Sequence, residues 1–293
     1  RAGMATNRPL RRRASTTCES IVALRVPGIP VLNLRSRLPF APKTKRQRKQ
    51  PKSVVFYAGP SLLDGAPIIG IITGLRQSKG LKSENPKTAD LVQTWILRAD
   101  VAPHEALHSG EDASICGECP LRPYLAKGTG KPLCYATCSG GRAAIVNLWR
   151  SYAMGNIPQV SPEEAAGMLL GRKVRLGAYG DPAALPFEVW ETLLQRSGGS
   201  IGYTHQWRTC DARFARLVMA SVETSHLRNE AKKAGWRTFR IQEVPAPKQT
   251  GEAICPGSRE AGKKLSCAEC MACSGTQDGR RGDIVIAAHG SGR

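Results

Sequence analysis

Residues 173–205 read KVRLGAYGDPAALPFEVWETLLQRSGGSIGYTH, and this stretch indicates the fold class most directly. Lys173 to Tyr179 is typical of a short strand, and Ser200 to His205 is typical of a second one. Between them, Pro186 to Gln195 repeats large apolar residues with the spacing of one helical face. Strand, helix and strand in this order favour a right-handed β-α-β unit with parallel strands.

The same alternation continues on both sides of this stretch. Further strands are expected at 53–57, 91–97, 217–222, 237–242 and 283–288, and further helices at 143–154, from 161, at 211–216 and at 224–234. Strands that alternate with helices in this way form layered α/β domains. We therefore predict an α/β fold with a mostly parallel sheet or an incomplete (β/α) barrel.

The positive charge of the chain is concentrated at its N-terminal end. The 293 residues carry a net charge of +20, of which residues 1–52 contribute 14 Lys and Arg against one acid, Glu19. We expect this basic leader to be disordered and to attract nucleic acid only nonspecifically, through its phosphates. Residues 53–290 are expected to form a single α/β domain, with cysteine-rich insertions at 104–138 and 255–273.

The bulk composition excludes a membrane protein. Apolar residues make up 41% of the chain, and no run approaches the roughly 20 apolar residues that a membrane helix needs. No apolar segment of signal-peptide length follows the basic residues, which favours the reducing cytoplasm of a bacterial host cell. In that compartment, clustered cysteines indicate metal or redox chemistry rather than disulfides. Composition does not indicate an oligomeric state.

The strongest motif lies near the C-terminus. Cys267, Cys270 and Cys273 have C-x2-C-x2-C spacing, and Cys255, followed by proline, lies 12 residues before the triplet. Zinc sites commonly use paired cysteines, whereas three closely spaced cysteines with a remote Cys-Pro approach the ligand arrangement of four-iron clusters. We predict a metal centre on these four cysteines, with a [4Fe–4S] cluster favoured and zinc as the alternative.

A second cysteine set lies in the middle of the chain. Cys116, Cys119, Cys134 and Cys138 have C-x2-C-x14-C-x3-C spacing. Four such ligands could form a zinc ribbon-like site, whereas the first three alone could hold a second iron–sulfur cluster with one open iron. Cys138 is the weakest candidate because its gap is looser, and two histidines of the same loop, His104 and His108, are alternative ligands.

Polar residues follow several expected strands at their carboxyl ends. Asp181 follows the first strand of the quoted stretch, His205 ends the second, and Glu223 follows the next strand. Comparable residues at other strand ends are Ser221, Gln242, Glu243, His289 and Gly290. In parallel α/β folds ligands bind at this edge. We therefore predict that Asp181, His205 and Glu223 lie together as candidate catalytic residues.

Five segments together resemble a family of phage and plasmid proteins named gene product 88. They are residues 54–61 (VVFYAGPS), 115–122 (ICGECPLR), 175–184 (RLGAYGDPAA), 202–207 (GYTHQW) and the final cysteine triplet. The resemblance spans roughly residues 53–290 and implies a mobile-element origin, but the family has no assigned activity. The strand-end pattern also resembles radical S-adenosylmethionine barrels, although their C-x3-C-x2-C spacing is absent here.

The leading interpretation is a metal-binding, iron–sulfur protein of phage or plasmid type. It would be an enzyme if the strand-end residues form a site, with S-adenosylmethionine as a candidate cofactor. The alternative is a zinc-stabilised protein without catalysis that binds nucleic acid or acts as a host-takeover adaptor. The sequence does not identify a substrate or a reaction.

Overall fold

The computed structural model describes residues 50–76, 87–125, 134, 143–242, 247–262, 265–279 and 282–288, which all belong to one compact unit, Lys49–Arg293. The basic leader lies outside the described residues apart from its last three positions, so its nucleic-acid binding stays a prediction. No helix in the described part of the chain is both long and apolar enough to cross a bilayer.

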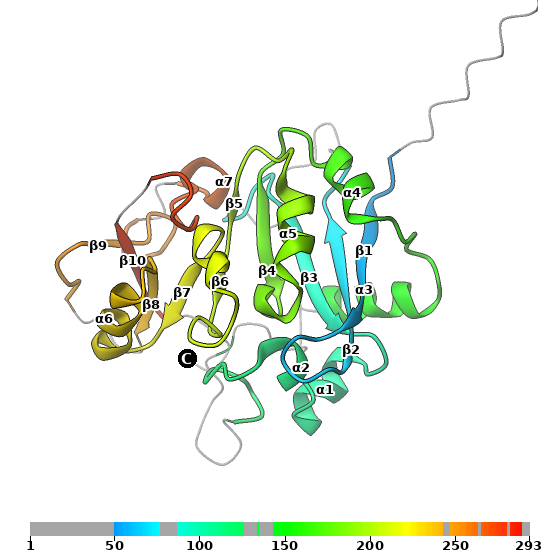
Figure 1. Ribbon diagram of the computed structural model, residues 1–293, viewed down its shortest axis with the longest axis horizontal. Helices are drawn as coiled ribbons and strands as arrows, with labels where there is room; N and C mark the ends of the chain where they lie inside the picture. The colour runs from blue at the N-terminus through cyan, green and yellow to red at the C-terminus, as the bar shows by residue number, and fades with distance from the viewer. Residues whose placement is uncertain are drawn as a thin grey trace, which may run out of the picture. The chain divides into compact units, whose positions relative to one another are not determined.

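Ten strands and seven α-helices make up the described secondary structure (Figure 1). The strands are β1 Ser53–Pro60, β2 Pro67–Thr73, β3 Val92–Arg98, β4 Val174–Tyr179, β5 Ser200–Ile201, β6 Tyr203–Thr204, β7 Met219–Val222, β8 Thr238–Gln242, β9 Glu252–Ile254 and β10 Asp283–Ala287. The helices are α1 Pro103–Ser109, α2 Ala113–Cys116, α3 Ala143–Ala153, α4 Pro162–Met168, α5 Phe187–Leu194, α6 Ser225–Lys233 and α7 Cys267–Cys270. Two short 3-10 helices span Pro182–Ala184 and Ala212–Arg216.

The strands form two five-stranded sheets. The first has the order β1-β2-β3-β4-β5, with antiparallel pairing from β1 to β3 and parallel pairing from β3 to β5. The second has the order β6-β7-β8-β10-β9, and all of its pairs are parallel. The predicted α/β class is confirmed. The expected mostly parallel pairing is also present, although the described strands form two sheets rather than one. The alternative of an incomplete barrel was wrong, because the described strands form no barrel.

The antiparallel part of the first sheet arises from a hairpin that the sequence did not reveal. The turn between β1 and β2 is held by the Ser61 hydroxyl, which accepts from Leu63 N–H, and by Asp64, which accepts from Ala66 N–H. Gly65 lies in this turn with φ of 81°, a conformation that L-residues rarely adopt. A connection this short can join only antiparallel strands, because a parallel crossover needs a dozen or more residues.

Helix α5 covers one face of the first sheet, in front of β4 in Figure 1. Its Trp190 is fully buried, and the Trp190 ring lies 5.4 Å from the ring of Phe56 on β1. Gly70 on β2 makes room for Phe56, since a Cβ atom there would lie 2.7 Å from the Phe56 ring. The Phe56 ring, which contacts Trp190, therefore packs over Gly70, a strand position that has no side chain.

The two sheets meet at Gly202, between β5 and β6. Its N–H donates to the carbonyl of Cys273 at 3.1 Å, and its own carbonyl accepts from Met219 N–H at 3.0 Å. A Cβ atom here would lie 2.9 Å from Leu176 and 3.0 Å from Val218. The strand hydrogen bonding is interrupted at this residue because one of its backbone groups binds the cysteine-bearing C-terminal loop.

Candidate functional site

A cavity of about 400 Å³ lies against strands of both sheets. The strands contribute Arg175, Gly177, Ala178 and Tyr179 from β4; Ile201, Tyr203 and His205 from the β5–β6 segment; Phe239 and Ile241 from β8; and Ile286 and Ala287 from β10. In the β5–β6 segment and in β8 the lining residues alternate, so one face of each forms part of the wall. The volume is within the range of small-molecule sites.

Three cysteines of the central set line the same cavity. Cys116 ends helix α2, Cys119 follows in the next turn, and Cys134 approaches from a later part of the loop. Burial raises the pKa of the Cys116 thiol well above its usual value, and the nearby sulfurs of Cys119 and Cys134 raise it further. Cys138 lies outside the described residues, so its role as a fourth ligand stays a prediction.

A buried ion pair shapes the loop that carries Cys116 and Cys119. Arg122 Nε and Nη2 donate to the two carboxylate oxygens of Asp112 at 3.1 and 2.7 Å, and the Asp112 side chain is fully buried. Arg122 also donates to the carbonyls of Gly110 and Gly117, at 2.6 and 3.2 Å. One guanidinium thus fixes both ends of the turn around the cysteines.

Gln206, which lies just after β6 of the second sheet, holds the same turn through two hydrogen bonds. Its Nε2 donates to the carbonyl of Cys116 at 3.0 Å, and its Oε1 accepts from Glu118 N–H at 3.4 Å. Gly117 lies between them with φ of 52°, and a Cβ atom there would lie 2.5 Å from the Gln206 amide. The amide can reach the backbone of this turn because residue 117 has no side chain.

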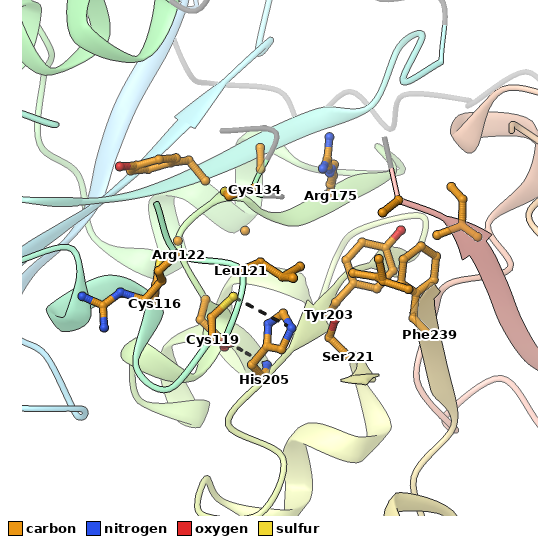
Figure 2. Close-up of a pocket in the computed structure, with 18 of the residues that line it drawn as sticks. Cys116, Cys119, Leu121, Arg122, Cys134, Arg175, Tyr203, His205, Ser221 and Phe239 are labelled. Atoms are coloured by element: carbon orange, nitrogen blue, oxygen red, sulfur yellow. Dashed lines mark hydrogen bonds between the residues drawn. The ribbon is translucent and has the colours of Figure 1, made fainter. Parts of the chain in front are cut away.

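His205 connects Cys119 of the central set to a carboxylate. Its Nε2 lies 3.9 Å from Cys119 Sγ (Figure 2) and 2.8 Å from Glu223 Oε1. Burial disfavours the charged imidazole, but the interactions with Cys119 and Glu223 outweigh it and raise the pKa of His205 from 6.5 to about 10. The imidazolium is therefore the form that this arrangement stabilises.

Asp181 positions His205 through the backbone. One carboxylate oxygen accepts from Ala183 N–H at 3.0 Å and the other from His205 N–H at 2.8 Å. Burial raises the pKa of Asp181, while these hydrogen bonds favour its charged form. The expected proximity of Asp181, His205 and Glu223 is therefore present. Asp181 acts here as an acceptor for two backbone amides, and a catalytic role for any of the three stays a prediction.

Helix α7, which carries Cys267 and Cys270, lies near β5, at the opposite end of the first sheet from α1 and α2 (Figure 1). Cys255, Cys267, Cys270 and Cys273 all line a second cavity of about 30 Å³. Helix α7 is fixed by a capping box between Ser266 and Glu269. Cys267 lines both cavities, so one residue of the C-terminal set borders the large cavity that the central cysteines line.

Arg237 holds the loop that carries the last of these cysteines. Its guanidinium donates to the carbonyls of Ala272, Ser274, Gly275 and Gly282, at distances between 2.6 and 3.2 Å. The residue is buried. A planar group with five N–H donors suits this array of carbonyls, whereas a lysine ammonium could satisfy only part of it.

None of the described cysteines forms a disulfide. Among the described residues, no group of three or more His, Cys, Asp or Glu side chains is arranged to hold a metal ion. A tetrahedral zinc ion would need sulfurs roughly 3.8 Å apart, given Zn–S bonds of 2.3 Å. Metal binding at either set therefore requires the side chains to turn toward a shared centre, and it stays a prediction.

The other candidate residues differ in whether they line the large cavity. Ser221 lines the large cavity, whereas Glu223 touches it only through His205. The His104 side chain is about half exposed, and neither it nor His108 lines the cavity. Glu243, His289 and Gly290 lie outside the described residues.

Sequence reasoning missed four residues that border or support the two cysteine sets. They are Lys87, Arg175, Tyr203 and Arg237. The period of two along the β5–β6 segment could have placed Tyr203 on the same face as His205. No sequence signal marks Arg237, because its partners are backbone groups distant in the sequence.

The chain shows no match to any family model, and no curated protein or solved structure matches it significantly. The resemblance to gene product 88 proteins therefore stays a prediction.

Proposed function

We propose that this chain is an iron–sulfur protein whose large cavity is an active site for a small molecule. In this proposal Cys255, Cys267, Cys270 and Cys273 bind a [4Fe–4S] cluster. Cys116, Cys119 and Cys134 bind a second centre whose open position faces the cavity. The phage or plasmid origin implied by the resemblance belongs to the same proposal.

The observation that carries the proposal is the shared cavity. Cys116, Cys119 and Cys134 come from separate parts of one loop, yet all three line the space that Cys267 also borders. Both loops are held by buried arginines, Arg122 and Arg237, so the geometry does not come from apolar packing alone. Cysteines gathered in this way, outside any disulfide, are typical ligands of iron–sulfur clusters and zinc.

The central set has room for a reactive metal position. Cys116, Cys119 and Cys134 alone would leave a fourth coordination position open, and catalytic metal sites keep such a position for substrate or cofactor. S-adenosylmethionine is one molecule that an open iron could bind, and the cluster would supply electrons to it. The residues of this chain would bind the molecule, exclude water and hold protons.

The role of His205 in this proposal follows from its contacts. The Glu223 carboxylate favours the protonated imidazole, and Asp181 fixes the backbone at the same residue. A protonated histidine at the cavity wall can donate a hydrogen bond to bound substrate or serve as a general acid. Asp181 and Glu223 would then be positioning residues, acting through His205.

Metal analysis and optical spectroscopy on protein purified without oxygen test the proposal. We expect brown protein with iron and inorganic sulfide in equal amounts, at roughly four of each per cluster. The paired variants C116S/C119S and C267S/C270S should each lose one centre and keep the other. Cys210 is half-buried and belongs to neither set, so C210S is the matched control and should keep both.

Two other outcomes would decide against iron. Colourless protein with stoichiometric zinc at both sets would support the zinc-stabilised alternative. Protein without metal, prepared in cells supplied with iron and zinc, would contradict the ligand assignment itself.

A further inference from the structure

Three side chains on one face of the second sheet line the large cavity together. Ser221 on β7 pairs in register with Phe239 on β8. Tyr203 on β6 pairs with Met219, which lies two residues before Ser221 on the same strand. Paired residues, and residues two apart on one strand, point to the same face of a sheet. Tyr203, Ser221 and Phe239 therefore reach the cavity from three neighbouring strands.

The two rings of this group form an apolar wall. The rings of Tyr203 and Phe239 have centroids 4.1 Å apart and an interplanar angle of 34°. Figure 2 shows them at one side of the pocket with Ser221 beside them, and the three cysteines at the other side. A flat ring stacks favourably on such a wall. Three isoleucines extend the apolar surface, namely Ile201, Ile241 and Ile286.

The ionisable side chains that line the cavity are engaged within the protein. Their contacts are those of Arg122 with Asp112, of Asp181 with the amides of Ala183 and His205, of the His205 ring with Glu223 and Cys119, and of Lys87 and Arg175 with Cys267. The cysteines of the central set are the ligands of the proposed metal centre. A ligand without charge can therefore lie against the apolar wall without competing for any of these contacts.

Ser221 adds an unpaired polar group to this wall. The residue is only 3% exposed, and its hydroxyl has no hydrogen-bond partner among the described residues. The neighbouring Tyr203 hydroxyl, by contrast, hydrogen bonds with Cys273. A serine hydroxyl can donate one hydrogen bond and accept two, and a buried one that makes none is unfavourable. A ligand that supplies a hydrogen bond here would relieve that cost.

We infer that the cavity binds an uncharged, flat heteroaromatic molecule, whose ring lies against Tyr203 and Phe239 and whose ring N–H donates a hydrogen bond to Ser221 Oγ. The wall supplies the affinity for the ring, and the hydroxyl selects ligands that carry a polar atom at the ring edge. That this ligand is a substrate rests on the proposed function, whereas its binding does not.

Isothermal titration calorimetry with indole and benzofuran tests the inference. Both probes are uncharged and nearly equal in shape, but only indole has an N–H. The titrations use anaerobically purified full-length protein of measured metal content. We expect the wild type to bind indole about fivefold more tightly, as one net hydrogen bond implies. S221A should lower indole affinity to that of benzofuran without changing benzofuran affinity, whereas S221T keeps the hydroxyl and should keep the preference.

Ser200 on β5 provides the matched control. It is also a buried strand serine whose hydroxyl has no partner within the described part of the chain, but it is not among the residues that line the cavity. S200A should bind both probes as the wild type does. F239L should weaken both probes by a similar factor, because stacking on the wall does not depend on the N–H.

Benzofuran binding by S221A also shows that this variant is folded. Equal affinities of the wild type for the two probes, or an unchanged preference in S221A, would overturn the inference. Absence of binding by either probe to metal-loaded protein would overturn it and leave the proposed function standing. The expected preference in a protein that holds no iron would support the inference and contradict the proposed function.

Discussion

The amide of Gln206 donates a hydrogen bond to the backbone carbonyl of Cys116, across 90 residues of sequence. The same side chain accepts from Glu118 N–H, so it fixes the turn between two candidate metal ligands. The second sheet thereby controls the geometry of a loop that begins in the first. Gln206 is a positioning residue in this arrangement.

Replacing Gln206 with methionine keeps the volume of the side chain and removes both hydrogen bonds. We expect Q206M to lose the metal centre at Cys116, Cys119 and Cys134 and to keep the C-terminal one. The unpaired carbonyl should also cost about 1–3 kcal/mol of unfolding free energy. Iron content and thermal unfolding measure the two effects. Gln195 is exposed, so Q195M should change neither, and equal metal loss in both variants would contradict this role.

Removing Asp112 should destabilise the protein strongly. D112A leaves the Arg122 guanidinium buried without its carboxylate, and such a loss costs about 3–5 kcal/mol. The exposed pair Arg208–Glu230 provides the comparison, because E230A should cost about 1 kcal/mol or less. Urea unfolding at fixed metal content compares the two. Similar losses in both variants would mean that the buried pair does not hold the cysteine loop.

Replacing Arg237 with lysine should loosen the C-terminal cysteine loop. Lysine keeps the charge but cannot donate to the four carbonyls that Arg237 contacts. We expect R237K to lose the cluster at Cys255, Cys267, Cys270 and Cys273 and to become sensitive to proteolysis within residues 255–282. Mass spectrometry of limited digests locates the cleavage. Exposed Arg216 gives the control, R216K, and an R237K digest identical to that of R216K would refute the assignment.

Low pH should lower the free energy of unfolding through protonation of Glu252. Burial opposes its charge, but Arg240, which donates to both carboxylate oxygens at 2.7 Å, and Gln249 N–H outweigh burial and hold the pKa of Glu252 below 4.5. The folded state therefore keeps this carboxylate charged at pH values where the unfolded chain binds a proton. The resulting stabilisation is complete above the unfolded pKa and is lost as pH falls through the lower, folded pKa.

Urea unfolding measured across the acid range tests this prediction. The unfolding free energy of the wild type should decrease below about pH 5, and that of E252Q should be lower at neutral pH and decrease less steeply. Glu163 is exposed on helix α4, so E163Q should retain most of the wild-type slope. If the unfolding free energy of E252Q falls with pH as steeply as that of the wild type, groups other than Glu252 cause the acid sensitivity.

Several features of the fold could be read from local sequence. The strands β4, β7, β8 and β10 and the helices α3, α5 and α6 lie close to their expected positions, because apolar periodicity and capping act within a few residues. The hairpin of β1 and β2 was missed, although Gly65 and Asp64 are typical turn residues. The break at Gly202 could not be foreseen, since it depends on a hydrogen bond to Cys273.

The sequence by itself determined the α/β class, the spacing of the two cysteine sets and the polar residues at strand ends, because each arises from neighbours along the chain. Only the tertiary structure decided that the central set and Cys267 border one cavity, that Arg175 and Tyr203 share its wall, and that Gln206 and Arg237 hold the loops. These relations join residues tens of positions apart. Sheet order and strand register create them, and neither is encoded in any single segment.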